Sequence, residues 1–439
     1  GNMTMQNPYW VANRMNRTND RNRYMVSASL KYEILDWLNV TGRLRWDDAA
    51  TKQEDKRYAS TLKLFAPSDY GFYGYDKIND QTLYGDLMLN INKTLGENFS
   101  ISSNMGASFS RLKYDVTGFQ GGLKAPSNVF TPNAIDYGNA TNDNRPIFES
   151  YKHYINSMFI SAELGYRSML YLTLTGRNDW DSALHGTAQT SFFYPSVGLS
   201  WVINESFKLP QWISFGKIRG SWAQVGNDLP IGITDLSDII GAGGKLQAVD
   251  VYNRGDLKPE ISNSIEFGLE WRLFNSRVDF DFTYYKTDTK NQLLKVPTSA
   301  GEDYAYRYIN AGKIRNKGFE ITLGATPVLT EDFRWKTTFN YSQNRNKVVE
   351  LAPNYTSFVY GDPGFSMAYM MQIKEGGSLG DIYGNTFARD EQGKIKVSDE
   401  GKPISESGNK TYLGNCNPDF LLSWANTFTY KGFSLYFLI

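Results

Sequence analysis

Apolar and polar residues alternate with a period of two along much of the chain, most regularly from Ser264 to Lys286. Successive side chains of an extended strand point to opposite faces, so this pattern predicts strands with one apolar and one polar face. Asn275-Ser276 interrupts the alternation halfway, and a turn-forming pair between two such runs predicts a β-hairpin. In that hairpin Trp271 lies opposite Phe280, and all apolar pairs share one face.

Each arm of the hairpin holds about ten alternating residues, more than the five or six of an ordinary strand. A tilted strand that crosses a bilayer needs about 9–11 residues. We therefore expect one face to contact lipid and the other to line a lumen. The expected lipid-facing residues are Leu269, Trp271, Phe280 and Phe282, and the expected lumen-facing residues are Glu270, Arg272, Asp279 and Asp281. Taken alone, the hairpin fits a soluble β-sandwich equally well.

The same unit recurs along the chain and gives about fourteen strands, with short and long connections in alternation. Short turns on one side and long loops on the other are typical of a membrane barrel and have no counterpart in a sandwich. The prediction is an all-β fold, a large antiparallel transmembrane β-barrel with short periplasmic turns and long extracellular loops. Residues 23–439 are assigned to a partial barrel and residues 1–22 to a polar loop. The long polar loops include 49–81, 111–153 and 345–418.

Composition argues against several classes of function. Lys+Arg and Asp+Glu both number 46, so no basic excess exists to bind nucleic acid. Two histidines, His153 and His185, and one cysteine, Cys416, predict neither a disulfide nor a metal site. No motif for catalysis or for a cofactor is present, and we expect no enzyme. The acid pairs Asp47-Asp48 and Asp179/Asp181 are interpreted as solvated charges, with a cation bound by Asp179/Asp181 as an alternative.

Aromatic residues make up 15% of the chain and gather in the predicted loops. Aromatic rings can stack on sugar faces or dock a protein, or they can pack within the loops themselves. The candidate substrate-binding residues are Tyr70, Phe72, Tyr73, Tyr75, Trp180, Tyr194, Tyr304, Tyr306 and Tyr308. The candidate partner-docking residues in the longest loop are Phe358, Tyr360, Phe365 and Tyr369.

A series of motifs resembles the barrel of SusC/RagA-type TonB-dependent transporters of Bacteroidota. The motifs are Arg177-Asn178-Asp179-Trp180, Tyr194-Pro195-Ser196-Val197-Gly198, Lys217-Ile218-Arg219-Gly220-Ser221-Trp222, Leu257-Lys258-Pro259-Glu260, Asn316-Lys317-Gly318-Phe319-Glu320 and Asn417-Pro418-Asp419-Phe420. Each motif alone is weak, but the series is specific, follows the family's order and covers nearly the whole chain.

The resemblance implies an outer-membrane barrel of about 22 strands, of which about 14 are expected here. It also implies an N-terminal plug with a TonB box that contacts TonB, and a SusD-like lipoprotein on the barrel mouth. Neither plug nor TonB box matches this sequence, so we expect a portion of a longer protein. The leading hypothesis is active import of oligomeric nutrients, glycans ahead of peptides. The alternatives are a passive porin and a secreted β-sandwich that binds or cleaves polysaccharide.

Overall fold

The computed structural model describes most of the 439 residues. Its description leaves out residues 1–5, 139–144, 188, 232, 234–238, 241–245, 248–250, 253–256, 299–305, 311, 352–354 and 361–368. Within the described residues, no helix is both long and apolar enough to cross a membrane. The architecture is all-β, with one short helix, α1 (Pro8–Arg14), and three single 3₁₀ turns. Those turns are η1 (Pro132–Ala134), η2 (Ser182–Leu184) and η3 (Ile203–Glu205).

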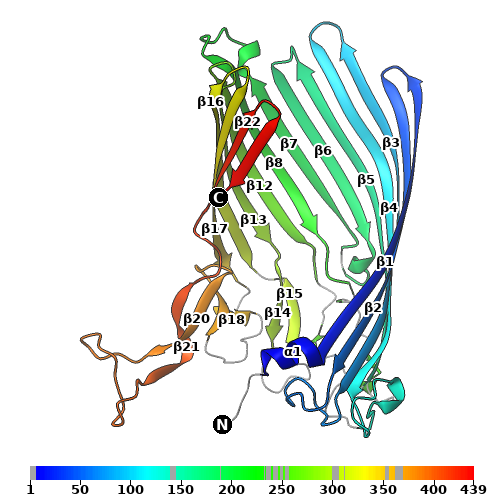
Figure 1. The fold of residues 1–439 in the computed structure, drawn as a ribbon. Helices are drawn as coiled ribbons and strands as arrows, with labels where there is room; N and C mark the ends of the chain where they lie inside the picture. The colour runs from blue at the N-terminus through cyan, green and yellow to red at the C-terminus, as the bar shows by residue number, and fades with distance from the viewer. Residues whose placement is uncertain are drawn as a thin grey trace.

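Fourteen strands form one antiparallel sheet in which each strand pairs with the next one along the wall. They are β1 (Met15–Leu35), β2 (Leu38–Arg57), β3 (Phe72–Leu95), β4 (Phe99–Gly122), β5 (Arg145–Tyr166), β6 (Leu170–Asp181), β7 (Ser191–Val202), β8 (Ile213–Asn227), β12 (Glu260–Leu273), β13 (Val278–Lys290), β16 (Lys313–Leu329), β17 (Phe333–Glu350), β22 (Leu421–Tyr430) and β23 (Phe433–Leu438). The sheet curves into an open trough with β1 and β23 at its two edges (Figure 1). The fourteen-strand prediction is confirmed.

Smaller sheets lie at the long-loop end. Strands β18 (Ser357–Tyr360), β19 (Tyr369–Lys374), β20 (Asp381–Phe387) and β21 (Ser405–Asn415) form one of them, and it projects away from the wall below β17 (Figure 1). Strands β11 (Val251–Tyr252), β14 (Leu293–Pro297) and β15 (Tyr306–Asn310) form a second, and β9 (Ile239–Ile240) pairs with β10 (Leu246–Gln247). The long-loop end is therefore a structured mouth.

The hairpin of β12 and β13 has the predicted register. Trp271 pairs with Phe280, Leu269 with Phe282, and Leu273 with Val278 next to the turn. A slip of one residue would have placed the rings on the polar face, so period-two alternation and a tight turn fix the pairing.

The polar face of this hairpin has basic groups where two acids meet. Glu270 pairs with Asp281 across the strands, an unfavourable pair if left alone. Arg272 Nη2 donates to Glu270 at 2.9 Å, and Arg219 Nη1 donates to Asp281 at 3.1 Å from neighbouring β8. The two guanidinium groups offset the repulsion between the carboxylates.

Aromatic side chains mark two levels on the outer face of the wall. Phe99, Tyr166 and Trp201 lie at the turn end, where Phe99 pairs with Tyr166 and their rings lie 5.0 Å apart. Tyr154 and Trp180 share the same face near the mouth. Such girdles flank the hydrocarbon band of a transmembrane barrel, so the membrane-spanning segments lie between these two levels.

The strands extend well beyond that band toward the mouth, which differs from the sequence-based expectation. Within residues 1–22, expected as a polar loop, the structure has α1 and the start of β1, with Met15 paired to Arg57. Most of the 49–81 loop belongs to β2 and β3, and only 58–71 connects them. Outside the bilayer both faces of a hairpin meet water, so pairing continues although the alternation ends.

The predicted separation of short turns from long connections is confirmed. The short turns near Asp36, Lys93, Ser168, Asn275 and the last hairpin lie at one end of the wall, and the long connections lie at the other (Figure 1).

Candidate functional site

The inner face of the wall carries paired charges. Arg23 to Asp47 at 2.6 Å and Arg43 to Asp86 at 3.0 Å join adjacent strands, and Arg219 to Asp281 at 3.1 Å reaches from β8 across β12 to β13. The acid Asp47, one of the sequence-predicted solvated acids, is thus bound by Arg23 and also by Arg45. These groups can exchange hydrogen bonds with a polar solute without a large net charge.

A four-residue network on this face contains one of the sequence-predicted residues, Tyr194. Its hydroxyl donates to Asp179, which also accepts from Arg177 Nε at 2.8 Å. Arg177 Nη2 donates to Ser157 at 2.7 Å, so β5, β6 and β7 each supply a member. Asp179 is occupied by these partners, and the cation site considered for Asp179 and Asp181 stays a prediction.

Just beyond this network, an apolar cluster packs on the mouth side of β6 and β7. Its buried members are Leu184, Phe192, Leu229, Ile233 and Leu257. Tyr194 and Tyr308 both pack against the cluster. The structure therefore brings together two candidate aromatics that lie far apart in sequence, at the place where the polar wall meets the mouth.

The aromatic group near residue 73 is packed into its own loop. Tyr73 is 6% exposed and belongs to a cluster with Leu123 and Ile135. Its hydroxyl donates to Glu54 at 3.3 Å. Burial, reinforced by the Glu54 charge, raises the pKa of Tyr73 to about 12, so the hydroxyl stays a neutral donor. Tyr73 therefore stabilises the loop by packing and by hydrogen bonding within it.

The neighbours of Tyr73 differ in exposure. Tyr75 stacks on Phe119 with centroids 5.3 Å apart, and the Arg57 guanidinium lies 4.6 Å from the ring of buried Phe72. Tyr70 is 43% exposed and remains available to a ligand.

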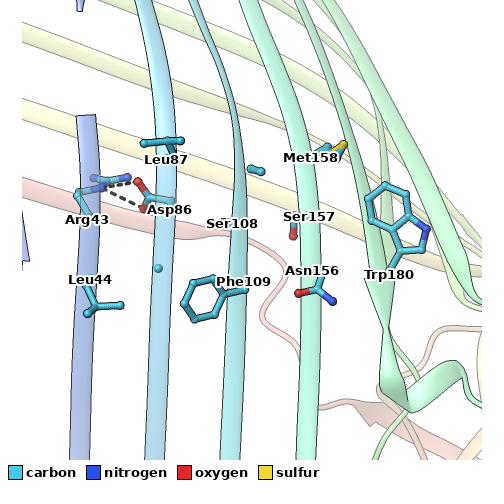
Figure 2. Close-up of a pocket in the computed structure, with 12 residues that line it drawn as sticks. Arg43, Leu44, Asp86, Leu87, Ser108, Phe109, Asn156, Ser157, Met158 and Trp180 are labelled. Atoms are coloured by element: carbon cyan, nitrogen blue, oxygen red, sulfur yellow. Dashed lines mark hydrogen bonds and ion pairs between the residues drawn. The ribbon is translucent and has the colours of Figure 1, made fainter. Parts of the chain in front are cut away.

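Trp180 lies on the outer face, level with the mouth-side girdle, and is 42% exposed. It borders a hollow of about 640 Å³ between Leu44, Leu87, Phe109 and Met158 (Figure 2). Most of the polar lining residues, such as the ion pair of Arg43 and Asp86, belong to the opposite face of the same strands, whereas Asn156 pairs with Trp180 and shares the outer face. Because the apolar rim lies on the outer face of the wall, we expect it to contact lipid chains and not a solute.

Several predicted residues have no described side chain. Tyr304 and Phe365 lie outside the described residues. Tyr306 lies in β15, and Phe358 and Tyr360 lie in β18, without a description of their side chains. Their roles in substrate binding or docking stay predictions. Tyr369 in β19 is 56% exposed.

The structure also assembles a group that sequence reasoning missed. His153, interpreted as a surface residue, is half-buried, and its Nε2 lies 2.6 Å from Asp181 Oδ1. Hairpin register could have shown this contact, because Ile155 pairs with Asp181 and His153 lies two positions farther on the same face. The third member, Asp228, follows β8, and no local pattern places it there.

Comparisons with known proteins agree with this architecture. Residues 2–430 match the family described as TonB dependent receptor-like, beta-barrel. The chain is 24% identical to TonB-dependent receptor P3 of Formosa agariphila, over 98% of this chain and 45% of that protein. It is 25% identical to the TonB-dependent receptor SusC of Bacteroides thetaiotaomicron, over 56% of this chain and 27% of that protein.

Among solved structures, the chain is similar to the RagAB peptide transporter, with a TM-score of 0.77 and 17% identity. That match covers 98% of this chain and 48% of the other. The chain thus spans less than half the length of the relatives it matches.

Proposed function

The chain belongs to the TonB-dependent receptor β-barrel family, and on that premise we propose that it forms part of the wall of an outer-membrane importer of oligomeric nutrients. Barrels of this family cross the outer membrane with strands, and one of this size encloses a lumen wide enough for a plug or a channel. The observation that carries the proposal is the polar inner face, where ion pairs join β1 to β2, β2 to β3, and β8 to β13. Passage through this lumen breaks no bond, so its residues bind and guide.

The substrate class proposed first is an oligosaccharide. The network of Ser157, Arg177, Asp179 and Tyr194 offers hydroxyl, guanidinium and carboxylate groups, which match sugar hydroxyls. Tyr308 packs against the same apolar cluster as Tyr194, and such a ring can stack on an apolar sugar face. A peptide is the second candidate, because a solved protein of similar fold is named a peptide transporter.

Uptake by intact cells tests the energy source. Cells carrying the intact protein would be given fluorescent oligosaccharides or peptides, with and without a functional TonB. We expect uptake to stop when TonB is inactivated. Uptake that continues at the same rate would show a passive porin and would overturn active import.

A variant of Tyr308 tests the binding role. Tyr308→Ala removes the ring, and one ring contact contributes about 0.5–1.5 kcal/mol, which is about 2–10-fold in the half-saturating concentration of substrate. Tyr308→Phe keeps the ring and should stay near the native value. Tyr284→Ala is the control, because Tyr284 faces outward on β13. An equal effect of Tyr308→Ala and Tyr284→Ala would remove Tyr308 from the site.

The proposed partner at the mouth is a SusD-like lipoprotein. The sheet β18–β21 with its β20–β21 connection carries a group of exposed apolar side chains: Tyr369, Phe387, Ile395, Val397, Tyr412 and Leu413. Exposed apolar groups of this kind often mark interaction surfaces. These exposed side chains support docking of the lipoprotein on the projecting sheet. For TonB, we propose a contact with a region outside this chain.

Co-purification tests the docking surface. The double variant Ile395→Ser/Val397→Ser changes two exposed side chains on a connection that pairs only with itself. We expect at least a tenfold weaker hold on the lipoprotein, which corresponds to about 1.4 kcal/mol. Leu64→Ser, an equally exposed change in the 58–71 loop, is the control. Full recovery of the lipoprotein with the double variant would exclude this surface.

A further inference from the structure

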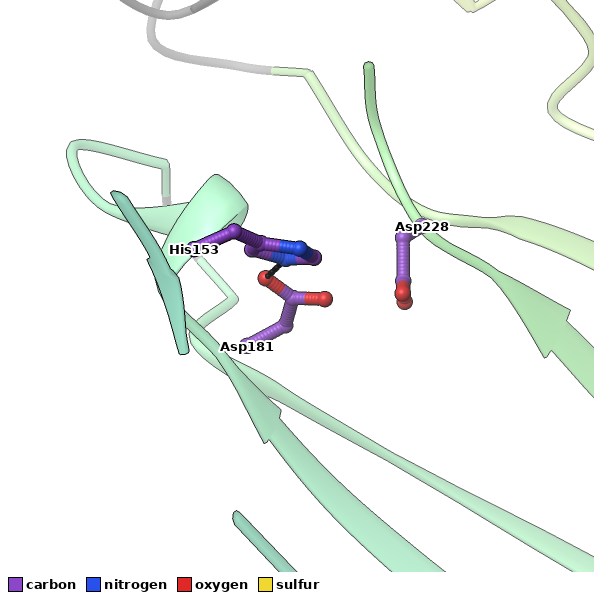
Figure 3. A group of neighbouring side chains, drawn as sticks. All are labelled: His153, Asp181 and Asp228. Carbon is purple, nitrogen blue, oxygen red and sulfur yellow. Dashed lines mark hydrogen bonds and ion pairs between the residues drawn. The ribbon is translucent and has the colours of Figure 1, made fainter. Parts of the chain in front are cut away.

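His153, Asp181 and Asp228 converge from three separate elements at the mouth side of the wall (Figure 3). His153 lies in β5, Asp181 ends β6, and Asp228 follows β8. One ligand atom from each, an imidazole nitrogen or a carboxylate oxygen, lies within 4.8 Å of the other two. All three lie beyond Tyr154 and Trp180, outside the membrane-spanning segments.

The second oxygen of Asp181 lacks a hydrogen-bond donor among the described residues while Asp228 is ionised. Its side chain is fully buried, Oδ1 contacts His153 and accepts from the Ala183 backbone N–H at 2.6 Å, and Oδ2 has no hydrogen-bond partner. A buried carboxylate oxygen without a partner costs free energy and is rare in native proteins. Its position beside Asp228 and His153 marks a place for a positively charged ligand.

The group is rich in carboxylates. Asp181 and Asp228 each bring an acidic side chain to it, and Asp179 lies two residues before Asp181 on β6. Asp179 is already bound by Arg177 and Tyr194, whereas the ligand atoms of Asp181, Asp228 and His153 lie close to one another. Two neighbouring carboxylates repel each other unless a proton or a cation lies between them.

We propose that His153, Asp181 and Asp228 bind a divalent transition-metal ion of the Zn²⁺ class. One imidazole and two carboxylates favour such an ion over Ca²⁺, which prefers six to eight oxygen ligands. Tetrahedral Zn²⁺ at about 2.0–2.2 Å from each ligand needs ligand atoms about 3.3 Å apart, and three protein ligands leave one position for water. Asp228 is exposed and lies at the start of a connection, so it is the ligand that would move closer to the other two when the ion binds.

The bound ion would tie the segment after β8 to the hairpin of β5 and β6. Asp228 directly precedes Leu229, a buried member of the apolar cluster against which Tyr194 and Tyr308 pack. Two bonds already orient the Asp181 side of the site, since Ala183 N–H holds the Asp181 carboxylate and Ser182 Oγ accepts from the Tyr154 N–H at 2.9 Å. Metal binding would therefore order the mouth beside the proposed solute path, and the inference stands independently of the transport function.

Zinc titration of the intact protein tests the site. The protein would be purified in detergent, stripped with EDTA and titrated with Zn²⁺, with Cys416→Ser in every sample. We expect one ion per chain at micromolar affinity or tighter. His153→Gln and Asp228→Asn should each weaken binding at least tenfold. His185→Gln is the matched control, because His185 is the other histidine of the chain and is exposed.

Co²⁺ provides a spectroscopic readout that a merely structural role would not change. The visible absorption of tetrahedral Co²⁺ should appear in the native protein and in His185→Gln, and should be lost in Asp228→Asn. Heat-dependent gel mobility would confirm that each variant is folded, and Asp228→Asn serves where His153→Gln fails to fold. Three results would each overturn the proposal: no zinc binding below 100 µM, binding unchanged by His153→Gln, or Ca²⁺ binding more tightly than Zn²⁺.

Discussion

Gly216 on β8 makes room for the indole of Trp271 on the outer face of the wall. The two residues pair directly across the strands. A Cβ at Gly216 would lie 2.8 Å from Cζ3 of Trp271 and 3.0 Å from Cε3, closer than nonbonded carbon atoms approach. Gly216→Ala therefore forces the ring to tilt. Gly220, four residues along the same strand, has 3.8 Å to its nearest neighbour, the Glu266 carbonyl oxygen, and can accept alanine.

Gly216→Ala and Gly220→Ala have the same effect on the free energy of the unfolded chain but different effects on packing in the folded state. Each removes the flexibility of glycine from the unfolded chain, which stabilises the fold by about 0.4–1 kcal/mol. Overpacking at Gly216 costs about 1–3 kcal/mol. We expect Gly216→Ala to be less stable than Gly220→Ala by about 1–3 kcal/mol, since the difference isolates the clash.

Guanidinium unfolding of the protein in phospholipid vesicles, followed by tryptophan fluorescence, measures this difference. Repeating both substitutions in a Trp271→Leu background completes a double-mutant cycle, and the gap between the two positions should then largely close. Equal stability of Gly216→Ala and Gly220→Ala in the native background would refute the reasoning. A gap that persists without Trp271 would assign the cost to the backbone of Gly216.

Two further predictions concern the membrane. Leu269→Arg should destabilise the protein by about 2–4 kcal/mol in the same assay, because Leu269 is five residues from the turn, at about 2.5 Å each, and so lies near the middle of a hydrocarbon band about 25 Å tall. Asp281→Ser breaks a half-exposed ion pair on the lumen face and should cost less than about 1 kcal/mol. The reverse order of these two costs would invert the assignment of faces. A membrane-impermeant maleimide applied to intact cells should label Cys416, which is exposed at the mouth. It should not label the variant Cys416→Ser/Asn275→Cys, whose new cysteine lies in a turn at the opposite end of the wall. Labelling of that variant would contradict an extracellular mouth.

The strand pairing of the wall was predictable from the sequence because the hydrophobic alternation and the tight turns indicate the same pairing. In β12 and β13, alternation selects the face and the turn selects the register, so pairs such as Trp271 with Phe280 follow from the sequence residue by residue. The rule fails where the bilayer ends. The polar start of β1 is a paired strand without alternation, since water covers both of its faces. The start of β3 at Phe72 is paired too, but there Phe72 and Tyr73 are buried under the mouth loops.

The candidate site was predictable only in part, because its members meet through long-range contacts. Tyr194 and Tyr308 share a cluster, although no sequence pattern connects their segments. Tyr73 was expected to face a ligand and instead packs within its own loop, which aromatic content alone does not distinguish. Asp228 reaches His153 and Asp181 from another strand end, a placement set by the fold of the whole mouth.

The sequential order of the strands allows the mouth to change at little thermodynamic cost. Each strand of the wall pairs with its neighbour in the sheet order, and two of these pairings, β8 with β12 and β17 with β22, span long insertions. The second insertion, residues 351–420, is more than twice as long as the first, residues 228–259. Loop-closure entropy grows only with the logarithm of length, so each doubling costs about 0.6 kcal/mol. One wall can therefore carry mouths of very different size, and specificity can diverge while the membrane-spanning strands stay the same.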